Sequence, residues 1–304
     1  MKYQYKLRIF QIDAFTDQPF GGNPAVVVLD ADRLRESAVE RVSRETITGQ
    51  TVFVYPSKVA DYKFRYMTPR GEMAFSGHLT VAGFTALTEE GLIEVVNDVN
   101  MFTLETQAGV LEIEVVKNET SGLHEVQITH ENPEFMATYD PKDIAEALGL
   151  TLADIMSPNP IQTVSTGTPQ LMVPVNTLKA LERIRPDWER LNGLQEGSDW
   201  ISVQVFTRET FAPTSDVHVR HFAPALGISE DPVTGSAAGS MCAYMIKYGL
   251  FDVTIPVTSI VIEQGHFMGR PGKIFVEVRG DSDEITQVKV SGTGITVIRG
   301  TLYV

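Results

Sequence analysis

The feature of this sequence that most constrains its fold is an internal duplication. Residues 77–91 (GHLTVAGFTALTEEG) and 235–249 (GSAAGSMCAYMIKYG) have the same length, are rich in small residues, and both begin and end with glycine. The residues that follow also match, GLIEV against GLFDV. Glu105 and Glu263 then lie 158 positions apart, the same separation as the two segments. Matches in one register indicate that the chain contains two copies of a single structural unit.

Both glycine-bounded segments are predicted to be helices that end at the second glycine, a residue typical of that position. The stretch SAAGSMCAYM in the second segment leaves no polar face for water, so we expect a sheet to wrap around this helix. Upstream, RYMTP at 65–69 and RHFAP at 220–224 are 155 positions apart, which indicates a loop three residues longer in the second copy.

Apolar runs and alternating patterns predict the remaining strands and helices. In the first copy we expect strands at 6–15, 25–29, 51–55, 62–67, 102–105 and 110–116, with a helix from about 33 to 47. In the second copy we expect strands at 161–165, 171–175, 200–206, 217–222, 259–263, 273–279, 286–292 and 296–303, with a helix at 178–191. Residues 126–133 and a helix at 141–148 would connect the copies.

Short turns between neighbouring strands imply largely antiparallel sheets. We therefore predict the α+β class, with two pseudo-symmetric domains at residues 1–124 and 125–304. Each domain would wrap its sheet around a central helix, and the last strand could return to the first domain. An active-site cleft would lie between the domains.

The charge balance argues against several classes of partner. The 304 residues include 25 Lys and Arg against 39 Asp and Glu, a formal net charge of −14. Nucleic-acid binding relies on neutralising phosphates, so nucleic acid and anionic membranes are not expected partners. No apolar run approaches the ~20 residues that cross a bilayer, and the start lacks the apolar region of a signal peptide. We expect a cytoplasmic protein.

The sequence offers no signal for a metal or an organic cofactor. Cys242 is the only cysteine, which excludes an intrachain disulfide and a cysteine-based metal cluster. The histidines His124, His130, His218 and His266 show no ligand spacing, so no metal site is expected. No G-x-G-x-x-G motif lies between a strand and a helix, so no dinucleotide is expected either.

The candidate binding site is where the two central helices begin, at Gly77 and Gly235. Glycine lets a ligand approach the backbone closely, and the N–H groups of a first helical turn have no partner within the helix. The helix dipole adds roughly half a positive charge there, which favours a carboxylate or phosphate. If both helix starts face one cleft, this acidic protein would hold an anionic small molecule.

Four polar residues stand beside these helix starts. His78 can orient or donate a proton and Asp231 can accept one, so the two suit proton transfer. Each also has a purely structural interpretation: His78 as an internally bonded histidine, and Asp231 as a residue that orients its own turn. Thr234 and Ser236 are common helix-capping types, so these loops could be capped helix starts without a ligand.

At these residues the sequence resembles a known family. IDAFTDQPFGGNPAVVV, LETQAG, FAPALGISEDPVTGSAAGS, MGRPG and VSGTGITVIRGTLYV occur in this order and together resemble the PhzF family of phenazine-biosynthesis isomerases. The wider fold is similar to that of diaminopimelate epimerase and proline racemase. The resemblance extends from Ile12 to Leu302.

The resemblance implies a cofactor-free enzyme, usually a homodimer, that isomerises trans-2,3-dihydro-3-hydroxyanthranilate by moving a proton. It implies that His78 and Asp231 contact the substrate and that Gly77, Gly235 and Ser236 hold its carboxylate at the helix starts. In the family, a glutamate in the motif [ST]-E-x-x-F-V carries the proton.

Gln50 stands where that glutamate would be, in GQTVFV at 49–54. An amide has no ionisable proton near neutral pH and cannot serve as a general acid or base. The paired cysteines of the racemases are absent too, with Ser76 and Thr234 near their places.

Three functions stay open. The chain could be an isomerase of a different carboxylate, which uses His78 with Asp231 or a water held by Gln50. It could be an inactive paralogue that only binds a carboxylate. It could also be a racemase or lyase that acts on a small amino or hydroxy acid.

Overall fold

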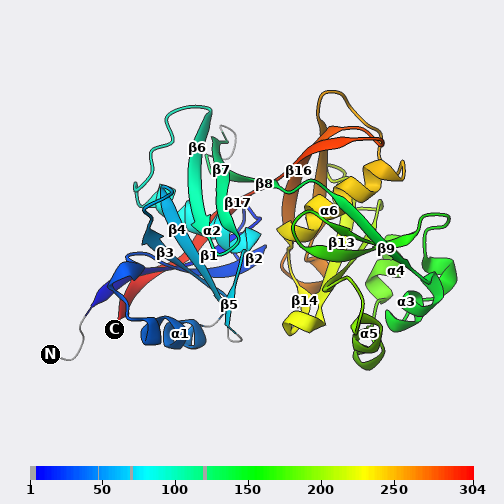
Figure 1. Ribbon diagram of the computed structural model, residues 1–304, viewed down its shortest axis with the longest axis horizontal. Coiled ribbons are helices and arrows are strands. Elements are labelled where there is room, and N and C mark those ends of the chain that lie inside the picture. Colours follow the sequence, from blue (N-terminus) through cyan, green and yellow to red (C-terminus); the bar gives the residue numbers. More distant parts are fainter. Residues whose placement is uncertain (1–4, 47, 69–70, 119–121) are drawn as a thin grey trace. The chain divides into compact units, whose positions relative to one another are not determined.

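The computed structural model describes residues 5–46, 48–68, 71–118 and 122–304, and it separates into two compact units (Figure 1). The first unit is Met1–Thr129 with Ser291–Val304, and the second is His130–Val290. Most of strand β8 (His124–His130) belongs to the first unit because it pairs with β7, so the unit ends later than the expected position 124. The C-terminal residues belong to the first unit because β17 (Ile285–Tyr303) pairs with β1 (Lys6–Ala14).

The first unit consists of paired strands and the helices that pack on them. Besides β1, β8 and the end of β17, its strands are β2 (Asn23–Val28), β3 (Thr51–Pro56), β4 (Tyr62–Thr68), β5 (Gly71–Met73), β6 (Val99–Thr106) and β7 (Gly109–Lys117). Its helices are the 3-10 turn η1 (Ala31–Arg33), α1 (Glu36–Glu45) and α2 (Gly77–Glu89).

The second unit likewise consists of paired strands and helices. Its strands are β9 (Glu134–Tyr139), β10 (Ile161–Ser165), β11 (Pro169–Pro174), β12 (Ser202–Thr207), β13 (Val217–Ala223), β14 (Ile228–Asp231), β15 (Thr258–Gln264), β16 (Gly272–Gly280) and the start of β17. Its helices are α3 (Pro141–Ala147), α4 (Leu178–Arg183), α5 (Trp188–Gln195) and α6 (Gly235–Lys247). Single 3-10 turns are η2 (Leu152–Asp154), η3 (Pro224–Leu226) and η4 (His266–Met268).

Strand pairing follows one pattern in both units. In the first, β1–β2, β3–β4, β4–β5 and β6–β7 are antiparallel, whereas β2–β3 and β4–β6 are parallel. In the second, β10–β11, β12–β13, β13–β14 and β15–β16 are antiparallel, whereas β11–β12 and β13–β15 are parallel. The order and sense of six pairings are therefore repeated, as the duplication in the sequence predicts. The fold is a mixed, strand-rich α/β arrangement.

Helices α2 and α6 hold corresponding positions in this pattern, after β5 and β14. Both have 13 residues. Both end at a left-handed glycine, Gly91 with φ 62° and Gly249 with φ 65°, where a side chain would be strained. The next N–H group, of Leu92 or Leu250, returns to a carbonyl in the last turn of its helix, at 2.9 and 2.8 Å.

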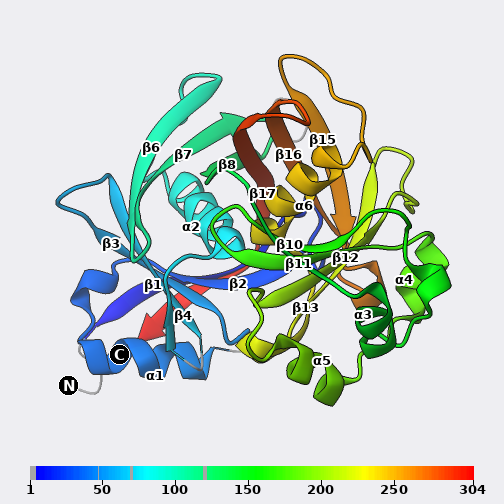
Figure 2. The same cartoon turned by 45° about the vertical axis from the view of Figure 1, so that its right-hand side comes forward.

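Each of these helices is enclosed by its own unit, which their small, apolar residues allow (Figure 2). All residues from Gly77 to Leu87 are buried, and α2 packs against β1, β2, β3 and β4. Helix α6 packs against β10, β11 and β16. Among the described residues, no helix combines the length and the apolar character that crossing a bilayer requires.

Gly83→Ala is expected to destabilise the protein by about 1–3 kcal/mol, the usual cost of overpacking. A Cβ atom at Gly83 would lie 2.4 Å from Cε2 of Phe64. The helix preference for alanine, roughly 0.5–1 kcal/mol, is too small to offset that clash. Urea unfolding measures the change. Gly193→Ala in α5 is the control, because a Cβ atom there meets nothing within 4 Å. If both variants were equally stabilised, the close packing of α2 on β4 would be contradicted.

Four expected elements differ from the structure. The helix expected at 178–191 is two helices, α4 and α5, because Pro186 lies between them and Asp187 caps α5 through the N–H of Arg190 at 3.1 Å. The two strands expected at 286–292 and 296–303 are the single strand β17. The helix expected at about 33–47 is η1 followed by α1, and Ile47 lies outside the described residues.

Candidate functional site

The start of α2 is not capped by the residue that precedes it. Ser76 has an extended backbone, and its side chain makes no capping hydrogen bond. Its Oγ lies instead 3.2 Å from Nδ1 of His78. The Ser76 carbonyl accepts from the N–H and the hydroxyl of Thr80, which fixes the first turn. The N–H groups of this turn therefore keep the capacity to bind an anion.

His78 is the most unusual side chain of the first turn. It is 8% exposed, and its Nε2 is buried without a hydrogen-bond partner among the residues that the structure describes. Burial lowers the pKa of His78 to about 4, so the imidazole is neutral at neutral pH. A buried polar atom without a partner costs free energy, and a bound ligand would remove that cost.

The start of α6 is held by a small network. Thr234 precedes the helix without capping it, and its hydroxyl donates to the Asp231 carboxylate at 2.5 Å. The buried amide of Gln264 donates to the Asp231 carbonyl at 2.8 Å and accepts from the Thr234 N–H at 3.1 Å. Asp231 therefore bonds within its own turn, and its contact with a substrate stays a prediction. The sequence did not predict a role for Gln264, because a lone glutamine belongs to no motif.

Gly235 and Ser236 form the first turn of α6. Gly235 is buried and Ser236 is half-buried. The Ser236 hydroxyl accepts from Nε2 of Gln170 at 3.2 Å, and the other end of that buried amide accepts from Ser202 at 2.6 Å. Gln170 therefore orients Ser236, a role that no local sequence signal could reveal.

Gln50 lies directly before β3 and is half-buried. Its backbone is anchored, because its carbonyl accepts from the N–H of Val26 at 3.0 Å. Its side-chain carboxamide makes no hydrogen bond within the described part of the chain. The position that resembles the family's proton carrier therefore holds an amide that is not committed to the fold.

The only thiol of the chain is not available for chemistry. Cys242 is fully buried in α6, and burial raises the pKa of this thiol far above its ordinary value. Hydroxyl residues, Ser76 and Thr234, precede the two central helices. The arrangement does not supply the thiol pair of a two-cysteine racemase.

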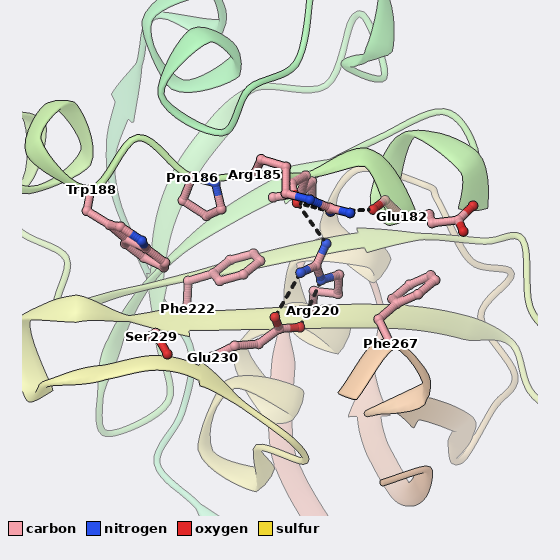
Figure 3. Close-up of a pocket in the computed structure, with 10 residues that line it drawn as sticks. Glu182, Arg185, Pro186, Trp188, Arg220, Phe222, Ser229, Glu230 and Phe267 are labelled. Carbon is pink, nitrogen blue, oxygen red and sulfur yellow. Dashed lines mark hydrogen bonds and ion pairs between the residues drawn. The ribbon is translucent and has the colours of Figure 1, made fainter. Parts of the chain in front are cut away.

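A cavity of about 420 Å³ in the second unit contains none of the predicted site residues (Figure 3). Trp188, Phe222 and Phe267 line it, and Arg220 crosses it. Both terminal groups of Arg220 are occupied, by Glu230 at 2.8 Å and by backbone carbonyls of α4 and the residue after it. This arginine supports the unit, and we assign no ligand to the cavity.

Comparisons with known proteins agree over nearly the whole chain. A model of the phenazine biosynthesis-like proteins (PhzC-PhzF) matches residues 12–300. YfhB of Bacillus subtilis (strain 168), named an uncharacterized isomerase, is 36% identical over 291 residues, which are 95% of each chain. The trans-2,3-dihydro-3-hydroxyanthranilate isomerase of Pseudomonas chlororaphis is 30% identical over 292 residues, 96% of this chain and 97% of that protein.

A solved structure also matches nearly the whole chain. The crystal structure of a phenazine biosynthesis protein of the PhzF family from Bacillus anthracis has a TM-score of 0.89 and 35% sequence identity. It covers 99% of this chain and 100% of that chain. Both curated relatives described above carry the name isomerase.

Proposed function

Because this chain belongs to the phenazine biosynthesis-like (PhzF) family of isomerases, we propose that it is an isomerase that moves a proton on a small carboxylate substrate. The observation that carries the proposal is the buried Nε2 of His78 in the first turn of α2, which has no hydrogen-bond partner among the described residues. A bound substrate would give this nitrogen its partner. The name of one relative, trans-2,3-dihydro-3-hydroxyanthranilate isomerase, supplies the substrate to test first.

In the proposed complex, the substrate carboxylate accepts hydrogen bonds from the first-turn N–H groups that follow Ser76. The helix dipole and these donors favour a negative group without any positively charged side chain. His78 is neutral, so one ring nitrogen donates and the other accepts. It can therefore orient a polar group of the substrate without a competing charge.

We further propose Asp231, Gly235 and Ser236 as ligand contacts at the start of α6. Support comes from the Gln264 and Gln170 bonds, which hold these residues in place in their unit. Pre-positioned groups lose little entropy when they bind a ligand. The proposed proton transfer needs only protein groups and water, so no cofactor is part of it.

A second candidate, a carboxylate-binding protein without turnover, is favoured by one observation. Gln50 places an uncommitted carboxamide where the family resemblance requires a carboxylate. An amide can hold a substrate or a water but cannot transfer a proton. Both candidates require the same anion-binding helix start, and they differ in whether a proton moves.

His78→Ala is expected to weaken the binding of anthranilate, an unreactive carboxylate of related shape, at least tenfold, a loss typical of a hydrogen bond to a charged group. The fold should persist because α2 keeps its apolar contacts. Calorimetric titration gives the affinity and thermal unfolding checks the fold.

The matched control is His124→Ala, which removes a half-buried histidine from β8 in the same unit. We expect it to leave the affinity unchanged. If His78→Ala bound anthranilate as tightly as the unchanged protein, His78 would have no part in the site.

A further inference from the structure

A second cluster of titratable side chains in the second unit includes none of the residues assigned above. It consists of His218 on β13, Glu263 on β15 and His266 in η4. One possible ligand atom from each of the three lies within 4.8 Å of the others. Sequence spacing gave no sign of this cluster, because His218 and Glu263 are 45 positions apart and meet only where β13 and β15 pair.

Glu263 fixes the orientation of His218. Its carboxylate is fully buried and lies 2.8 Å from Nδ1 of His218, so this ring nitrogen donates to it. The same carboxylate accepts from the N–H groups of Phe211, at 2.5 Å, and Ala212, at 3.1 Å. With Nδ1 occupied, the lone pair of His218 is at Nε2.

Two histidine nitrogens of the cluster are left unsatisfied. Nε2 of His218 and Nδ1 of His266 are buried without a hydrogen-bond partner in the described ranges. His218 is 0% exposed, so water cannot compensate. Phe211 stacks on His266, with ring centroids 4.8 Å apart, and Phe267 packs edge-on against His218 at 5.2 Å. His218 is enclosed among these rings, whereas His266 is half-buried with its Nδ1 inward.

The first unit shows which residues form a purely structural pair at the position that corresponds to His218 and Glu263. Lys63 of β4 and Glu105 of β6 occupy the same register there as His218 and Glu263, and they form an ion pair of 2.7 Å. The second unit replaces that lysine with histidine and adds a second histidine beside it. An ordinary ion pair needs neither change.

We propose that Nε2 of His218 and Nδ1 of His266 bind a transition-metal ion of the Zn²⁺ class, with Glu263 as the positioning residue behind His218. A metal-bound histidine typically donates its other ring N–H to a carboxylate, which is the arrangement seen here. Imidazole suits Zn²⁺, with metal–nitrogen distances of about 2.0–2.1 Å. Water that enters beside the half-buried His266 completes the coordination. The ion stabilises the β13–β15 pairing and takes no part in the proposed proton transfer.

The test titrates the chelator-treated, full-length protein with Zn²⁺ by calorimetry and with Co²⁺ by visible absorption. We expect one strong site per chain, a rise in melting temperature with Zn²⁺, and a cobalt spectrum typical of nitrogen ligation. His266→Ala, which removes a half-buried ligand, should weaken binding at least tenfold. Glu263→Gln should weaken it by about 10–100-fold.

His218→Lys best separates metal binding from a structural role, because it introduces the kind of ion pair that Lys63 and Glu105 form in the first unit. It should retain the ion pair and lose the metal. His124→Ala controls for binding at a histidine outside the cluster and should bind as the unchanged protein does. No strong site in the unchanged protein, or equal affinity in His266→Ala, would overturn the proposal. Either result would leave anthranilate binding at His78 unaffected, so the two proposals fail separately.

Discussion

Replacing Gln50 with glutamate is expected to raise the rate at which this protein isomerises trans-2,3-dihydro-3-hydroxyanthranilate by about 10²–10⁴-fold, the usual contribution of a positioned general acid or base. The backbone at Gln50 is already fixed by the N–H of Val26, and no described residue holds its carboxamide. Glutamate has the same length, so its carboxylate can occupy the space of the amide without rearrangement. The substitution restores the one ionisable group that the family resemblance requires and this chain lacks.

The rate is followed by loss of substrate and by deuterium uptake from D₂O. Gln50→Asn controls for a change of side chain without a gain of charge and should not raise the rate. The double variant Gln50→Glu with His78→Ala should lose the gain, because the substrate would no longer be held. No gain in Gln50→Glu, in a protein that still binds anthranilate, would mean that its site is built for a different substrate.

Arg220→Ala is expected to lower the free energy of unfolding by about 3–5 kcal/mol, the usual cost of breaking a buried ion pair. The Arg220 side chain is 9% exposed and forms two hydrogen bonds of 2.8 Å with Glu230. It also donates to the carbonyls of Leu181, at 3.0 Å, and Ile184, at 3.2 Å. Alanine would leave the Glu230 carboxylate without its guanidinium partner (Figure 3). It would also remove one donor from each carbonyl, although Leu181 keeps the N–H of Ile184 and Ile184 keeps the side chain of Arg185.

The duplication supplies the control for this prediction. Arg65 on β4 pairs with Glu72 on β5 as Arg220 on β13 pairs with Glu230 on β14. Its second partner, Glu36, has a side chain that is 70% exposed, so water replaces the lost bonds more easily. Arg65→Ala should therefore cost about 1 kcal/mol or less. If urea unfolding gave equal losses of unfolding free energy for the two variants, burial would not determine how much these ion pairs stabilise the protein.

Much of the fold could be predicted because the duplicated segments carry strong local signals. The glycines at 77, 91, 235 and 249 bound α2 and α6, and apolar runs mark the strands around them. Short elements gave no such signal: β5 has three residues and β14 has four, too few to show a periodic pattern. The break between α4 and α5 was missed although Pro186 marks it.

The sequence suggested candidate site residues only where they lie close to a motif. His78 follows Gly77 and Asp231 precedes Gly235 by four positions, so motif and helix start coincide. Gln264, which holds Asp231 and Thr234, and Gln170, which holds Ser236, come from distant strands and reach these residues only through the fold. The His218–Glu263–His266 cluster is hidden for the same reason.

The central claim is that Nε2 of His78, which has no hydrogen-bond partner in the described part of the chain, acquires one when a carboxylate binds at the start of α2. Nitrogen-15 NMR of the imidazole, with and without anthranilate, tests it directly. The account predicts a neutral ring in the free protein and a selective shift of the His78 Nε2 resonance that saturates with the calorimetric affinity. Saturating binding that leaves this resonance unmoved, or a free protein whose His78 is protonated at neutral pH, would contradict it.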